Sequence, residues 1–148
     1  MSLLIGNAPV AIGVSGGKDS CACAFATKDY LDQLGHAGPR LLIHSDLGRT
    51  EWQDSLPTCK RLAEATGLEL VVVRRKAGDM LARWQGRWTN NVERYRQLKC
   101  VKLILPWSTP SMRFCTSELK VDVICADLVK RWPGTTILNA TGIRADES

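Results

Sequence analysis

Short apolar runs alternate with longer mixed stretches along the first half of this chain. The pattern predicts three strands and two helices in alternation, with strands at residues 9–14, 41–45 and 68–73 and helices at residues 20–34 and 53–66. Pro57 is compatible with the second helix only near its first turn, and Gly67 is a suitable stop for that helix. The third strand is apolar enough to lie buried in a parallel sheet.

The second half of the chain is less regular. The predicted elements are a helix over residues 78–102 with a break near residues 89–91, a helix from Thr116 or Ser117 to residue 131 or 132, and a strand over residues 136–140. Strands that alternate with helices form right-handed βαβ units with helices on both faces of the sheet. The chain is therefore predicted to adopt an α/β fold: a three-layer, Rossmann-like arrangement around a mostly parallel, twisted sheet.

Length and composition fit one globular domain. The 148 residues, 45% hydrophobic and 24% charged, are enough to bury a core without disulfides. No apolar run reaches the roughly 18 residues of a membrane span, and the first residues lack the basic flank and apolar core of a signal peptide. A cytoplasmic protein without a membrane partner is therefore expected.

The six cysteines agree with a reducing compartment. No pair has C-x-x-C spacing, which argues against a simple zinc or iron–sulfur ligand set. In a cytosolic protein most cysteines are small buried hydrophobic residues. The six are Cys21, Cys23, Cys59, Cys100, Cys115 and Cys125.

The strongest chemical signal is the run S-G-G-K-D-S at residues 15–20, directly after the first predicted strand. A strand that feeds a Gly-rich turn and then a helix presents backbone N–H groups to a phosphate. Gly16 and Gly17 let the main chain approach an anion and tolerate positive φ. Lys18 adds a mobile positive charge, so the run predicts a phosphate-binding or sulfate-binding loop.

The other well-known phosphate loops do not fit this run. A Walker A sequence would need Gly where Ile12 stands and a hydroxyl where Asp19 stands, and no G-x-G-x-x-G is present. Asp19 or Ser20 is predicted to cap the helix that begins at Cys21. Asp19 has a second possible role as a magnesium-side carboxylate if the ligand is ATP.

Three predicted strand ends carry polar residues that belong at one edge of the sheet. Residues 15–20, Asp46 and the pair Gly142 and Arg144 each follow a strand, and ligands of such sheets bind beyond the carboxyl ends of strands. Asp46 is expected either to contact ribose or metal or to be a plain turn residue. Arg144 is expected either to make a paired contact with phosphate or sulfate oxygens or to form a surface ion pair.

Positive charge concentrates in residues 74–102. This segment has nine Lys or Arg against two acids, a net +7 that exceeds the +5 of the whole chain. The cations are Arg74, Arg75, Lys76, Arg83, Arg87, Arg94, Arg96, Lys99 and Lys102. With Trp84, Trp88 and Tyr95 between them, they suit a polyanion such as nucleic acid, or the phosphates of a small nucleotide. The alternative is a solvated helix face with both tryptophans packed into the core.

The run at residues 15–20 resembles the PP-loop signature SGG-x-DS of the adenine nucleotide α-hydrolase-like superfamily. Three further segments, residues 44–52, 113–121 and 141–148, resemble the phosphoadenosine phosphosulfate (PAPS) reductase family in the order that this family has them. Members of the superfamily bind ATP or a sulfonucleotide and act at the α-phosphate or at sulfur. In the segment at residues 113–121, Arg113 and Lys120 are weaker candidates for anion contact.

The resemblance implies a site for an adenine nucleotide: PAPS, adenylyl sulfate, or ATP with Mg²⁺. The residues expected to cradle its phosphate or sulfate are Ser15, Gly16, Gly17, Lys18 and Ser20. A reductase of this kind uses a cysteine thiolate that attacks sulfur, and a thioredoxin-like dithiol partner then releases sulfite. The family carries this cysteine in a C-terminal Glu-Cys-Gly-Leu-His segment, which this chain does not contain. Cys115 is the best internal candidate, and Lys18 is the other expected catalytic residue.

Two alternatives remain open beside sulfonucleotide reduction. The domain could split ATP between the α- and β-phosphates and adenylate a substrate for sulfur transfer, as enzymes of nucleic-acid thiolation do. It could also be a non-enzymatic nucleotide-binding module. Because the sequence stops at Ser148, inside the last of the family-like segments, the expectation is a single PP-loop domain over residues 1–148 that lacks a C-terminal segment.

Overall fold

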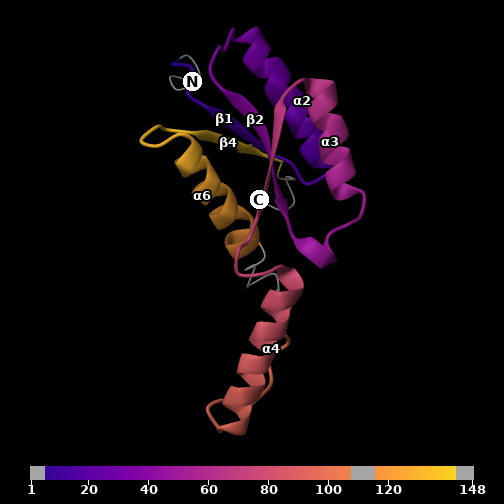
Figure 1. Cartoon of the computed structure of the whole chain (residues 1–148), viewed down its shortest axis with the longest axis vertical. Coiled ribbons are helices and arrows are strands. Elements are labelled where there is room, and N and C mark those ends of the chain that lie inside the picture. The colour runs from indigo at the N-terminus through magenta and orange to yellow at the C-terminus, as the bar shows by residue number, and fades with distance from the viewer. Residues whose placement is uncertain (1–5, 108–115, 143–148) are drawn as a thin grey trace.

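A parallel sheet forms the centre of the molecule in the computed structural model, which describes residues 6–107 and 116–142 (Figure 1). Its strands within these ranges are β1 (Val10–Gly13), β2 (Arg40–Asp46), β3 (Glu69–Arg74) and β4 (Leu138–Thr141). They lie in the order β3-β2-β1-β4, and every neighbouring pair is parallel. The α/β class and the parallel sheet predicted from the sequence are confirmed.

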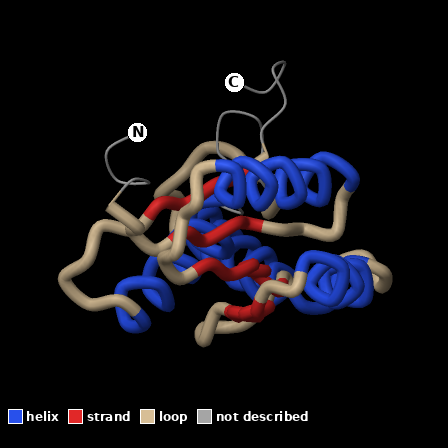
Figure 2. The backbone as a smooth tube through the Cα atoms, turned by 90° about the horizontal axis from the view of Figure 1, so that it is seen from above, coloured by secondary structure: helices blue, strands red, loops and turns tan. Residues whose placement is uncertain are grey.

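Helices cover both faces of this sheet (Figure 2). One face carries α2 (Lys18–Gln33) and α3 (Ser55–Thr66), and the other carries α6 (Asp122–Arg131). Pro57 lies in the first turn of α3, and Gly67 ends that helix with a left-handed φ of 68°, as predicted. The three-layer arrangement expected from the alternating pattern is therefore present.

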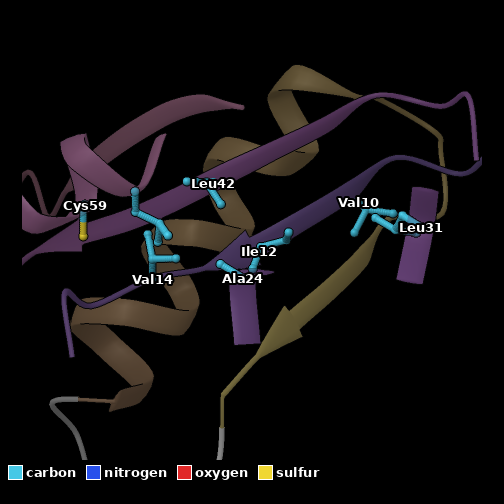
Figure 3. Close-up of a cluster of buried hydrophobic side chains, with 8 residues drawn as sticks. Val10, Ile12, Val14, Ala24, Leu31, Leu42 and Cys59 are labelled. Atoms are coloured by element: carbon cyan, nitrogen blue, oxygen red, sulfur yellow. The ribbon is translucent and has the colours of Figure 1, made fainter. Parts of the chain in front are cut away.

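The core is divided by the sheet because neighbouring strand residues point to opposite faces. Ile12 and Leu42 contact the side of α2 and α3, where they meet Leu31 and Cys59 (Figure 3). The alternate strand positions pack against Leu128 of α6 on the far face; they are Ala11, Leu41, Ile43, Val71 and Val73. The two central strands are buried on both faces, which explains their continuous apolar sequence.

The third strand differs from its prediction. Val71 and Val73 are buried, but Val72 is 44% exposed. In the described part of the chain β3 pairs with β2 alone, so it is an edge strand. Leu70 packs against the α3 side of the core, whereas that cover does not reach Val72. A fully buried third strand was therefore a wrong prediction.

Helix α4 (Met80–Arg96) extends beyond the sheet as an arm (Figure 1). The predicted break at residues 89–91 is absent, because Asn91 donates its side-chain N–H to the carbonyl of Ile104, 2.7 Å away, and keeps its helical backbone. The helix also stops before residue 102. Leu98 takes a left-handed φ of 53°, and Lys99 N–H closes the last turn on the carbonyl of Arg94.

The final helix is preceded by a π-helical turn, η2 (Ser117–Val121), where the sequence predicted an ordinary helix start. Leu119 of this turn is buried, and its carbonyl accepts the hydroxyl of Ser45 from β2. This contact ties η2 to the end of β2. Helix α6 then ends at Arg131, within the predicted boundary.

Candidate functional site

The loop between β1 and α2 lies at the point where the strand order of the sheet reverses. From β1 the chain continues to β2 on one side and later returns to β4 on the other. The helices of these two connections cover opposite faces of the sheet. A crevice at the carboxyl ends of the strands is the usual ligand site in such a sheet. The fold therefore places residues 15–17 where a ligand is expected.

Gly16 is required by the shape of this loop. Its φ is +76°, and a Cβ there would lie 2.6 Å from the carbonyl oxygen of Ser55, at the start of α3. Gly17 has an extended φ of −82°, and a Cβ on it would meet only the hydroxyl of Ser15, 3.6 Å away. Of the two glycines that tolerate positive φ, only Gly16 adopts it.

The two serines of the loop bond to each other. Ser15 N–H donates to Ser20 Oγ over 3.2 Å, and Ser20 Oγ donates to the carbonyl of Gly17 over 2.9 Å. Ser20 is buried, whereas Ser15 is exposed. Ser20 shapes the loop from inside, and the hydroxyl of Ser15 donates to Ser20 Oγ over 3.3 Å.

Helix α2 begins two residues earlier than predicted. Gly17 is its N-cap and Lys18 its first residue, so the prediction that Asp19 or Ser20 caps the helix is wrong. Cys21 donates the first intrahelical bond, to Gly17 over 3.1 Å. The amides of the first turn precede that ladder, and they carry the positive end of the helix dipole. With Lys18 exposed beside them, this end of α2 has the chemistry of an anion site.

The end of β4 meets the same turn of α2. A Cβ on Gly142 would lie 3.1 Å from the carbonyl oxygen of Asp19 and 3.3 Å from Cys23 Cβ. The structure thus brings Gly142 and the loop together, as the sequence predicted. Cys115 and Arg144, like Arg113, lie outside the described residues, so their proposed roles remain predictions.

Asp46 points away from the loop, toward the neighbouring strand. One of its oxygens accepts the amide of Gly48 over 2.7 Å, and the other forms an ion pair with Arg74. Burial alone would raise the pKa of Asp46, but these hydrogen bonds outweigh burial and lower it. This geometry favours the turn-residue alternative, and a contact of Asp46 with ribose or metal remains a prediction.

The side chains of His44, Glu51 and Cys59 lie close together beneath the loop. His44 Nδ1 donates to the carbonyl of Val14 over 2.9 Å, and its Nε2 lies 3.5 Å from a carboxylate oxygen of Glu51. Cys59 Sγ is 3.7 Å from the same imidazole. Burial, with Cys21 and Glu51 nearby, raises the pKa of Cys59 to about 11. Cys59 is therefore a neutral thiol and not a nucleophile.

The basic segment forms one wall of a hollow of about 680 Å³. The residues that line it are Arg75, Arg83, Gly86, Arg87, Asn90, Asn91, Arg94, Ile104 and Glu118. Trp84 packs against buried Met80, whereas Trp88 is 39% exposed. The core-packing alternative thus holds for the first tryptophan only. No local pattern indicates that Glu118 pairs with Arg83, 35 positions away.

Residues 6–107 and 116–142 contain no group of three or more His, Cys, Asp or Glu arranged to hold a metal ion. In these ranges no helix combines the length and apolar character needed to cross a bilayer. Fold and loop together define an α/β protein in which a glycine-containing loop leads into a helix N-terminus at the switch point of the sheet.

Comparison with known proteins shows a distant likeness to solved structures. No protein-family model matches the sequence, and no curated protein matches it. Among solved structures, the chain is similar to the U34-tRNA thiolase NcsA from Methanococcus maripaludis with its 4Fe–4S cluster, at 20% identity and a TM-score of 0.48. The match covers 95% of this chain and 55% of the thiolase chain, so this chain spans about half of that protein.

Proposed function

We propose that this protein is an adenine-nucleotide enzyme of the PP-loop type that adenylates a nucleic-acid acceptor for sulfur transfer. The acceptor oxygen attacks the α-phosphorus of ATP, the bond to the β-phosphate breaks, and pyrophosphate leaves. Sulfide then attacks the carbon that bears the adenylated oxygen, the carbon–oxygen bond breaks, and AMP leaves with that oxygen. The observation that carries the proposal is the loop at residues 15–17, which is fixed against Ser55 and leads into the exposed first turn of α2.

The loop supplies what a triphosphate requires. Backbone amides at the start of a helix bind phosphate oxygens, and their geometry is fixed here because Gly16 fits against α3 without room for a side chain. Lys18 is exposed at the first position of α2, where its charge can stabilise the phosphates as pyrophosphate departs. Mg²⁺ would enter with ATP as part of the substrate, and Asp19 is the acid nearest this turn.

Adenylation is favoured over sulfonucleotide reduction by the cysteines that the structure describes. Reduction requires an activated thiolate at the loop. Cys59 touches the loop region but is buried with a raised pKa, and Cys23 is half-buried against Gly142. Adenylation needs no thiolate in its first step. It does need a polyanionic acceptor, which the basic arm suits.

Reduction of PAPS or adenylyl sulfate remains the second candidate, because the amides of the loop bind sulfate by the same physics as phosphate. That reading depends on Cys115 as nucleophile and on a thioredoxin-like dithiol donor. A non-enzymatic nucleotide-binding module is the third candidate. The three differ in which nucleotide binds and in whether it is turned over.

Calorimetric titration with ATP and Mg²⁺, adenylyl sulfate and PAPS tests the proposal, together with release of pyrophosphate in the presence of RNA. We expect ATP with Mg²⁺ to bind, and Lys18→Ala to weaken it about tenfold or more, since a charge-assisted contact contributes about 1.5–3 kcal/mol. Lys60→Ala removes an exposed lysine from α3 and is the matched control, with unchanged affinity. Preference for a sulfonucleotide would favour reduction, and binding without any pyrophosphate release would favour the module.

A further inference from the structure

The hollow along α4 is lined by residues other than those of the loop at residues 15–17. Four arginines line it, and Glu118 is the acid among its lining residues, so its walls carry a net positive charge. Its length follows from the helix. Arg83 and Arg94 are eleven residues apart, which corresponds to about 16 Å along the axis of an α-helix. We refer to this hollow as the arm groove.

The arginines of the arm groove form a regular row. Arg83, Arg87, Asn90 and Arg94 follow one another at steps of four, three and four residues, which places them on one face of α4. A row of cations at this spacing matches a chain of phosphates better than a single phosphate. The repeating ligand with such a charge pattern is a polynucleotide strand.

Two exposed aromatic side chains lie on the face of α4 that is about 100° round the helix axis from this row. Trp88 is 39% exposed and Tyr95 is 46% exposed, and each directly follows an arginine of the row in sequence. Exposed rings next to cations are the usual platform for unstacked bases, because every base has a face that can stack. A paired duplex keeps its bases stacked inside, so this arrangement suits a single strand.

Glu118 forms an ion pair with Arg83, the first arginine of the row. Its carboxylate accepts two bonds from Arg83, at 2.7 and 2.9 Å, and lies 3.8 Å from Arg75. The hydrogen bond with Arg83 outweighs partial burial and lowers the pKa of Glu118, with a smaller contribution from Arg87. The carboxylate is therefore ionised at neutral pH and holds Arg83 as a phosphate oxygen would.

Gly86 leaves the floor of the groove open. A Cβ on this residue would have no atom within 4 Å, although the residue lies in the middle of a helix. The far wall is the segment that returns along α4, where Ile104 is held by Asn91. The groove is therefore bounded on two sides and open to a strand from solvent.

The start of α4 lies at the same edge of the sheet as the loop at residues 15–17. Arg75 directly follows β3, and Met80 at the start of α4 donates to the carbonyl of Leu47 just after β2. A second hollow, of about 630 Å³, shares Arg75 with the arm groove and reaches Gly48 and Arg49. Cations thus continue from the arm to the carboxyl ends of β2 and β3.

From these observations we propose that the arm groove binds a single-stranded polynucleotide, with its phosphates on the arginine row and its bases on Trp88 and Tyr95. Glu118 holds Arg83 in place and yields it when a phosphate arrives. This inference rests on the proposed function, for which it names the binding site of the acceptor. The recognised chemistry, a phosphodiester chain with exposed bases, is shared by RNA and DNA.

Fluorescence anisotropy with a labelled oligonucleotide of mixed sequence tests this site without ATP. The strand is used as RNA and as DNA, each single-stranded and annealed to its complement. We expect the single strands to bind more tightly than the duplexes. Combined Arg87→Ala and Arg94→Ala should weaken binding about tenfold or more and lower the salt slope by about two.

Matched variants show whether the strand binds in the arm groove or is attracted only by the overall positive charge of α4. Arg96→Ala removes a cation of the same helix that does not line the groove, and we expect less than about a twofold effect. Gly86→Leu obstructs the floor without a change of charge and should weaken binding about tenfold. Glu118→Gln should tighten it about threefold. Circular dichroism confirms that each variant keeps its helix.

Two outcomes would overturn the inference. One is an equal loss with Arg96→Ala and with the groove variants; the other is tighter binding of duplex than of single strand. The variant Lys18→Ala distinguishes a failure of the arm groove from a failure of the proposed nucleotide site. It should weaken nucleotide binding about tenfold or more while oligonucleotide affinity stays the same, so either site can fail without the other.

Discussion

The sheet and the arm of this protein are built on opposite principles. In the sheet, Leu42 and its neighbours are fully buried, and the loop at its edge is fixed by backbone contacts. In the arm, Leu98 is 91% exposed and Val101 is 96% exposed, and cations dominate the surface. Residues 74–102 carry a net +7 within a chain of net +5, so the rest of the chain is slightly acidic.

This difference matches what each region is proposed to bind. A loop that holds a triphosphate through amides works only if its main chain is fixed, since amides cannot adjust independently. An arm that holds a strand through arginines can tolerate motion, because long side chains adapt to the phosphates. Stability should therefore be concentrated in the sheet, with the arm as a separate, weaker unit.

The largest effect is expected at the loop, for Gly16→Ala. A methyl group there would meet backbone atoms of Ser55 at 2.6 Å, and the residue would keep a φ of +76°. We expect a loss of about 3–5 kcal/mol in the free energy of unfolding, measured by urea denaturation. Gly17→Ala is the control, with a cost below about 1 kcal/mol, because its φ is ordinary and its Cβ has room. Equal costs for the two variants would contradict the described loop.

The fold of the sheet was largely predictable from the sequence, and the reason is local. The runs that became β1 and β2 are apolar without interruption, so the predicted strand ends lie within one residue of the observed ends. The arm was less predictable. Asn91 stays helical because Ile104 accepts its N–H, and Leu98 ends the helix in a conformation that sequence rules assign to glycine. Both features depend on contacts that local patterns do not contain.

The candidate site likewise contains features that the sequence predicts and features that it does not. The loop was visible because its residues are consecutive, and the sheet topology then brought Gly142 beside it. The start of α2 was misjudged because Gly17 caps the helix without any side-chain bond. The pairing of Glu118 with Arg83 could not be found, since it joins a turn after the arm to a helix within it. Sequence spacing says nothing about such a pair.

An effect of intermediate size is expected when the free energy of unfolding is measured against pH, and it reports on the Cys59 thiol buried beneath the loop. The pKa of Cys59 is raised from 9.0 to about 11 by burial, so the folded state keeps the proton that the unfolded state releases first. Stability is complete below pH 9 and should fall between pH 9 and 11, by about 2–3 kcal/mol from this thiol. Cys59→Ala should flatten that fall, measured as the free energy of unfolding against pH.

The control for this pH effect is Cys125→Ala, which removes an exposed thiol from α6. Its alkaline slope should equal that of the wild type. If Cys59→Ala and Cys125→Ala change the slope alike, the thiol beneath the loop is not the group that titrates. The arm should stay helical through the same range, because Cys59 makes its contacts with the sheet side of the molecule.

The smallest effect is expected in the arm, and it tests whether sheet and arm are separate units. Gly86→Ala and Leu98→Gly each replace a residue that the helix disfavours: a glycine in an open helical position, and a leucine with left-handed φ at the end of α4. Each should stabilise the helix by about 0.5–1 kcal/mol. Hydrogen exchange should then slow at the amides of α4, while urea denaturation of the sheet is unchanged. If both readouts shift together, the arm unfolds with the sheet as one cooperative unit, and the contacts at Met80 and Asn91 are strong enough to join them.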